Sequence, residues 1–81
     1  MIYYKNIGWD KTIYNFYELV RETKNFNVFK HIGKKHHNGQ VFPDRTQIGQ
    51  DEFKLSKESK KLHKWNGEEM IENNNYTYTG P

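Results

Sequence analysis

The chain contains no cysteine, and this absence excludes several kinds of site at once. A disulfide framework, a zinc site with cysteine ligands and a thiol nucleophile all need cysteine. The lack of cysteine also fits a reducing compartment. The first ten residues lack the basic start and apolar middle of a signal peptide, and no long apolar run occurs. We therefore expect a cytoplasmic protein without a membrane span.

Alanine is also missing, and aliphatic residues are few, so the core has to be built from other side chains. The 81 residues include six Tyr, five Phe and two Trp, and each of these rings can bury a large area. Few apolar and many charged residues would also fit a disordered chain. Because the apolar residues recur along the chain, we expect one folded domain over residues 1–81, with no internal repeat. Residues 73–81 are expected to close a last hairpin or to form a mobile tail.

The net charge of +3 is unevenly distributed. Residues 28–66 carry nine Lys or Arg and four Asp or Glu, whereas residues 67–81 carry three Glu and no basic residue. No acidic residue occurs between Thr23 and Pro43. This distribution predicts a localised basic surface with an anionic partner, together with an acidic tail.

Three segments alternate between apolar and polar residues as strands do, namely residues 1–7, 26–32 and 40–42. Asn38 and Gly39 form a strong turn signal between the last two, so residues 26–42 are predicted to form a hairpin. Its tip, residues 33–39, would be a long basic loop. Pro43 either ends the return strand or places it at a sheet edge, because proline has no N–H to donate.

Residues 11–24 are predicted to form a helix that packs on this sheet. Asp10 can cap its first turn, and one face carries Ile13, Phe16, Tyr17 and Val20 at helical spacing. A second, shorter helix is predicted within residues 56–67, with Ser56 as its cap and Asn66 and Gly67 as its exit. It would dock through Leu55, Leu62 and Trp65. The sequence therefore predicts an α+β fold, with a small antiparallel sheet, one packed helix and a second short basic helix.

The second helix would carry four lysines on one face, because Lys57, Lys60, Lys61 and Lys64 follow the i, i+3, i+4, i+7 spacing. Such a face can neutralise phosphates, but it can equally be a solvated surface, or be masked by the acidic tail. If the hairpin tip lies on the same side, the basic surface is continuous. The candidate contacts for nucleic acid or another partner are then Lys57, Lys60, Lys61, Lys64, Lys30, Lys34, Lys35, His36 and His37.

Exposed rings beside these lysines could stack on bases. The candidates are Tyr3, Tyr14, Phe29 and Trp65, although a chain with few aliphatic residues needs most of its rings in the core.

The four histidines suggest two further kinds of site. A metal site is disfavoured, since His36 and His37 are adjacent and no Asp or Glu lies one helical turn from them. An acid–base role for His36 or His37 in a ribonuclease-like site is a third functional reading. The sequence has no strand–GxxxxGK–helix phosphate loop and no paired-carboxylate spacing. We therefore expect no metal, no cofactor and no enzymatic activity.

Two stretches give the chain its overall character, MIYYKNIGWDKTIYNFY and EEMIENNNYTYTG. The chain is short, free of cysteine and alanine, and rich in Asn, Lys, Tyr and Ile. In this composition it resembles the small early accessory proteins of T-even-like bacteriophages. The resemblance implies a counter-defence protein that binds and redirects a host factor, such as a toxin or nuclease, in the host cytoplasm.

These observations predict a non-enzymatic protein that binds nucleic acid, RNA rather than DNA, or an RNA-associated host factor, and so inhibits that factor. The alternative is a protein-only inhibitor whose lysines meet an acidic surface of a host enzyme. An oligomer is also conceivable, because an edge strand such as residues 1–7 could pair between copies.

Overall fold

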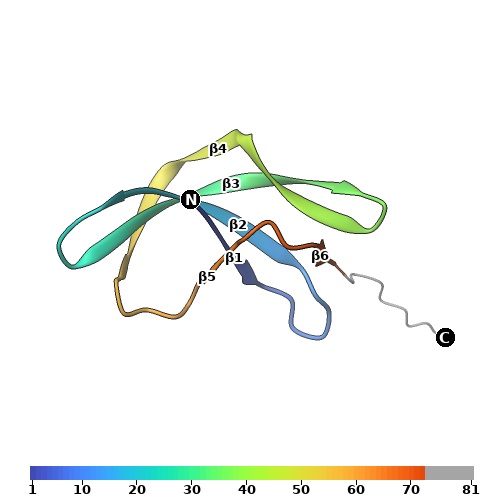
Figure 1. The fold of residues 1–81 in the computed structure, drawn as a ribbon, viewed down its shortest axis with the longest axis horizontal. Coiled ribbons are helices and arrows are strands. Elements are labelled where there is room, and N and C mark those ends of the chain that lie inside the picture. Colours follow the sequence, from blue (N-terminus) through green and yellow to red (C-terminus); the bar gives the residue numbers. More distant parts are fainter. Residues whose placement is uncertain (73–81) are drawn as a thin grey trace.

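The computed structural model describes residues 1–72, and these residues contain strands but no helix. All strand pairs are antiparallel, and they form a single sheet in the order β5-β1-β2-β3-β4-β6 (Figure 1). The strands are β1 (Ile2–Asn6), β2 (Tyr14–Glu22), β3 (Phe26–His37), β4 (Gln40–Ser56), β5 (His63–Lys64) and β6 (Met70–Ile71).

The sheet is curled into a half-barrel, and the last two strands explain how it is held. β5 and β6 follow one another in the chain but pair at opposite edges, β5 with β1 and β6 with β4. The segment from β5 to β6 therefore runs from one edge of the sheet to the other (Figure 1). Trp65, inside this segment, donates its backbone N–H to the carbonyl of Ile2 at 2.8 Å.

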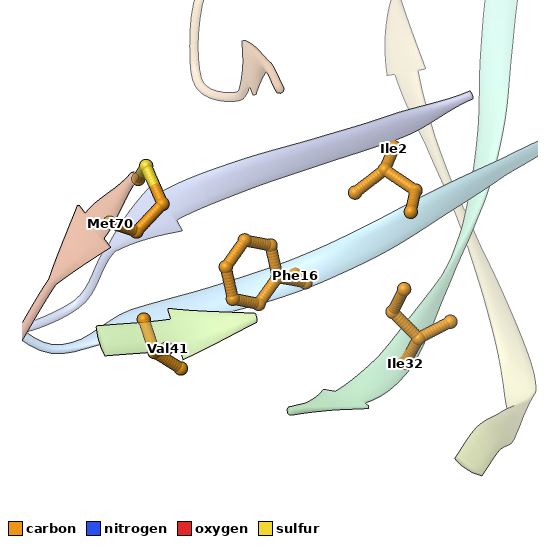
Figure 2. Packing of buried hydrophobic residues seen from close by; sticks show 5 residues of the cluster. All are labelled: Ile2, Phe16, Ile32, Val41 and Met70. Carbon is orange, nitrogen blue, oxygen red and sulfur yellow. The ribbon is translucent and has the colours of Figure 1, made fainter. Parts of the chain in front are cut away.

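The main core lies on the side that this segment crosses. Five buried side chains form it, and each comes from a different strand: Ile2, Phe16, Ile32, Val41 and Met70. Figure 2 shows the Phe16 ring between the others, and this ring is fully buried. Tyr4, Tyr14 and Trp65 pack around the cluster. One apolar residue from almost every strand thus holds the curled sheet together without a helix.

The predicted helix over residues 11–24 is wrong, because this segment contains β2. Tyr14 and Phe16, two residues apart, belong to the core side, as strand alternation requires. The helical spacing of the apolar residues is coincidental in a segment rich in rings and β-branched residues, which favour strands. β2 lies between β1 and β3, so neighbours on both sides satisfy its backbone.

The predicted basic helix is also wrong, and the fold is all-β rather than α+β. Ser59 donates its N–H to the carbonyl of Ser56 at 2.9 Å, but the turn does not continue into a helix. The N–H of Lys57 instead bonds the carbonyl of Asn25 at 3.2 Å. An isolated short helix is marginal in water, and these lysines would repel one another along its face. Trp65 does pack near the core, as predicted, from the segment between β5 and β6.

The predicted hairpin is confirmed, although its tip differs. Asn38 and Gly39 both have positive φ, 54° and 80°, and they connect the paired residues His37 and Gln40. This two-residue turn is the one that an Asn-Gly pair favours. The basic residues before it are part of β3 and do not form a loop. Pro43 lies inside β4, beyond the two residues that β6 covers, where β4 is an edge strand.

The strand predicted over residues 1–7 is confirmed as β1. The hairpin or mobile tail predicted for residues 73–81 lies outside the described residues.

Candidate nucleic-acid interface

The two predicted basic clusters do not form one surface. The β3–β4 turn lies at one end of the elongated molecule, which measures 52 × 24 × 23 Å (Figure 1). The segment after β4, with Lys60 and Lys61, lies toward the other end. Lys35, His36 and His37 are therefore separated from Lys60 and Lys61. The sequence did not predict this separation. Residues 33–37 were expected to lie in a loop, but they extend β3 and so carry the turn away from the rest of the sheet.

Lys34 and His36 are engaged by Glu72, whose side chain is only 4 % exposed. The Lys34 ammonium donates to Glu72 Oε2 at 2.8 Å, and His36 Nε2 lies 2.6 Å from Oε1. The N–H of Tyr14 also donates to Oε2 at 2.8 Å. Burial alone would raise the pKa of Glu72, but these hydrogen bonds outweigh burial and lower it. Glu72, just after β6, is therefore bound to β3 through Lys34 and His36 and to β2 through the N–H of Tyr14.

Lys57 and Lys30 also lie close to acidic side chains. The ammonium of Lys57 is 2.9 Å from a carboxylate oxygen of Glu22. Lys30 sits between Glu18 and Glu52 in the sheet register. Glu18 in turn binds the N-terminal amine and Arg45, and Glu52 binds Arg21. These contacts are mostly exposed and resemble ordinary surface ion pairs, which offset part of the positive charge of Lys57 and Lys30.

Four exposed lysines, which we call the basic edge, make no ion pair with any of residues 1–72: Lys5, Lys60, Lys61 and Lys64. Lys60 and Lys61 lie just before β5, separated from it by Leu62, and β5 is the strand at one edge of the sheet. Lys64 lies in β5, directly opposite Tyr3 of β1. Lys5 follows two residues after Tyr3 and so lies on the same face of the sheet as Lys64.

Lys35 is also exposed and has no ion pair among the residues described, but it lies near the other end of the molecule. The pKa of the nearby Asp44 carboxyl is lowered, mainly by hydrogen bonds from Thr46 and to a smaller extent by the positive charge of Lys35. His37 has Asn38 as its side-chain neighbour, with Nε2 3.2 Å from the amide nitrogen. In the part of the chain that the structure describes, no three His, Asp or Glu side chains are grouped so that they could hold a metal ion.

A row of rings crosses the sheet on the side away from the core. Tyr3, Tyr17 and His31 are direct neighbours across β1, β2 and β3. Ile2 and Tyr4, on either side of Tyr3, contribute to the core, so alternation places Tyr3 and its row on the opposite face. The Tyr17 and His31 rings lie 5.3 Å apart at a tilt of 37°.

Two phenylalanines complete this group. Phe29 is only 2 % exposed, with the Tyr3 ring edge-on at 5.1 Å and the Phe53 ring stacked at 5.7 Å. Phe53 also meets Tyr17 edge-on at 5.5 Å and remains 36 % exposed. Phe29 is thus the floor of a small aromatic cluster. We call its accessible residues, Tyr3, Tyr17, His31 and Phe53, the aromatic face.

Sequence reasoning found only part of this face. Of the four rings predicted to stack on bases, Tyr14 and Trp65 pack against the core, and Phe29 is buried. Tyr3 alone is accessible there. Tyr17 was missed because it was assigned to a helix. A strand reading of residues 14–22 would have placed Tyr17 on the side opposite Phe16, and pairing with β1 would have set it beside Tyr3.

Comparison of the chain with protein-family models, with curated proteins and with solved structures finds no match. The resemblance to phage accessory proteins rests on composition and stays a prediction. None of residues 1–72 forms a helix that could cross a membrane.

Proposed function

We propose that the protein is a non-enzymatic nucleic-acid-binding protein whose ligand is RNA, and that the basic edge contacts the phosphates. The observation that carries the proposal is the set of four exposed lysines without carboxylate partners in residues 1–72, at one edge of the sheet. Lysines placed against phosphates release bound counterions, which gives affinity without sequence preference. Under the phage resemblance, such binding would act against a host toxin or nuclease that works with RNA.

Two of the three glutamates after Gly67 are engaged elsewhere, and this supports the proposal. Glu68 accepts the N–H of Asn66 at 2.7 Å, and its carbonyl accepts the indole N–H of Trp65 at 3.1 Å. Glu72 is held by Lys34 and His36. Within residues 1–72, the glutamates after Gly67 form no ion pair with the basic edge, so its ammonium groups remain available to a polyanion.

Reversing two charges of the basic edge tests the proposal. In the double variant Lys60→Glu/Lys61→Glu, we expect affinity for RNA to fall about tenfold or more at low salt, because two phosphate contacts become repulsive. The slope of log affinity against log salt should become shallower by about one to two. The measurement is fluorescence anisotropy of a labelled RNA. Circular dichroism should be unchanged, since both side chains are exposed.

Lys35→Glu is the control, because it reverses an exposed lysine near the other end of the molecule. The single variant Lys61→Glu matches it in charge. Lys35→Glu should weaken binding much less than Lys61→Glu. Equal losses in these two variants would mean that only net charge matters, and an unchanged affinity in the double variant would refute the proposed contact.

A protein-only inhibitor is the second candidate, and Trp9 favours it. This ring lies in the β1–β2 loop, is 95 % exposed and has Ile7, also exposed, nearby in sequence. Tryptophan is enriched among the residues that dominate protein–protein binding. A pull-down from cell extract, with and without nuclease, separates the candidates. A partner lost after nuclease treatment supports RNA binding, and a retained partner supports the inhibitor.

A further inference from the structure

The aromatic face is an unusual feature for the open side of such a small sheet. The core already occupies the other side, where Phe16 lies between Met70 and Ile32 (Figure 2). Yet Tyr3, Tyr17, His31 and Phe53 gather on the outer side over Phe29. Burying Phe29 stabilises the sheet, but it leaves the Phe53 ring 36 % exposed and His31 exposed.

The charges around this face favour an anionic ligand. Lys64 continues the row of Tyr3, Tyr17 and His31 at the β5 edge, and Lys5 lies two residues along β1 from Tyr3. Both lysines belong to the basic edge. Two acidic residues adjoin the face along the chain, Glu18 after Tyr17 and Glu52 before Phe53, but basic groups pair with both, namely the N-terminal amine and Arg45 with Glu18, and Arg21 with Glu52. Asp51, two residues before Phe53 in β4, is exposed. Rings at the centre and ammonium groups at one side match the bases and phosphates of a nucleic acid.

We propose that the aromatic face stacks unpaired bases, so that the ligand is a single strand rather than a duplex. This inference rests on the proposed function and adds the class of nucleic acid. In a duplex the base faces are covered by their neighbours, whereas a single strand can turn them outward onto aromatic rings. Neighbouring strands are about 4.8 Å apart, so the three-strand row spans about 10 Å, enough for roughly two bases.

Removing the bases from the ligand tests the proposal most sharply. The probes are a labelled 12-nucleotide uridine RNA, the same strand with four central abasic sites, and a 12-base-pair RNA duplex. The wild-type protein should bind the intact strand about tenfold or more tightly than the abasic strand, because base stacking supplies part of the affinity. It should also prefer the single strand to the duplex at equal salt.

Tyr17→Leu keeps an apolar side chain but removes the ring. This variant should bind the intact strand about tenfold more weakly and should no longer distinguish it from the abasic strand, while its salt slope stays that of the wild type. Trp9→Leu, at an exposed ring outside the aromatic face, is the control and should behave like the wild type. Thermal unfolding of each variant verifies that it is folded. If Tyr17→Leu does not fold, His31→Ala replaces it, because His31 is exposed.

Photocrosslinking locates the bases directly. An RNA with 4-thiouridine at its central positions should crosslink to Tyr3, Tyr17, His31 or Phe53, as identified by mass spectrometry. Crosslinks to Trp9 or to the core side instead would overturn the stacking proposal. Equal binding of intact, abasic and duplex probes, with a normal salt slope, would also overturn it but leave the proposed function standing. Absence of binding to every probe at low salt would refute both.

Discussion

Phe16→Ala is expected to lower the free energy of unfolding by about 3–5 kcal/mol, because it removes a large ring from the centre of the core. Phe16 is fully buried, comes from the central part of the sheet and lies between Ile2, Ile32 and Met70. Its ring also meets Trp65 edge-on at 6.4 Å, so it supports the segment that joins the two sheet edges. Losing it would leave a cavity in the middle of the cluster that joins five strands of the sheet.

A chain of this length has a total stability of roughly 4–12 kcal/mol, so the loss removes a large part of it and would unfold the Phe16→Ala variant at the lower end of this range. Urea unfolding monitored by circular dichroism measures the change. Trp9→Ala is the control, because it removes an aromatic ring that is 95 % exposed, and it should change stability by no more than about 0.5 kcal/mol. Equal effects of the two substitutions would contradict the described core.

Glu72→Gln is expected to lower the free energy of unfolding by about 2–3 kcal/mol at pH 7. The substitution keeps the shape of the side chain but removes the charge that faces the Lys34 ammonium at 2.8 Å. Breaking a fully buried ion pair costs about 3–5 kcal/mol. Here Glu72 is buried but Lys34 and His36 are partly exposed, so solvent reduces the loss. Glu69→Gln, at an exposed glutamate without an ion pair in the described structure, should have almost no effect.

The effect of Glu72→Gln should depend on pH in one direction. The pKa of Glu72 in the folded protein lies below its ordinary value of 4.5, so its contribution to stability is complete above about pH 4.5. That contribution is lost as the pH falls through the lowered folded-state pKa. The stability difference between wild type and Glu72→Gln should therefore shrink as the pH falls below about 4.5. A difference that does not change with pH would show that the charge is not responsible.

Glu18 makes the wild-type protein acid-sensitive as well, so the difference between variants is the informative quantity. Burial raises the pKa of Glu18, but hydrogen bonds from the N-terminal amine and Arg45 outweigh it and lower the pKa. This contribution is present in both the wild type and Glu72→Gln and cancels when the two are compared.

The parts of the fold that follow from local sequence were predictable. Alternation along the first residues indicates β1, and Asn38-Gly39 indicates the turn, because positive φ at two successive positions restricts the residue types. β2 was not predictable in this way. Its apolar residues fit both a strand and a helix, and its pairing with β1 and β3 decides between them.

The candidate site was predictable only in its residue types. Lys34 and Glu72 are 38 residues apart, and nothing local in the sequence indicates that they meet. Without that contact, Lys34 and Lys60 look equally available to a phosphate. The aromatic face was hidden for a related reason, since Tyr3, Tyr17 and His31 become neighbours only through the sheet register. Long-range pairing therefore decides which basic and aromatic residues can act together.

The salt dependence of RNA binding is the decisive measurement for the basic edge. Binding of the wild-type protein to the labelled 12-nucleotide uridine RNA is followed by anisotropy at salt concentrations from about 50 to 200 mM. Four lysine–phosphate contacts predict a slope of about −2 to −3 for log affinity against log salt, which weakens binding roughly 15- to 60-fold over this range. A slope near zero, or no binding at the lowest salt concentration, would contradict the assignment of the basic edge to nucleic acid.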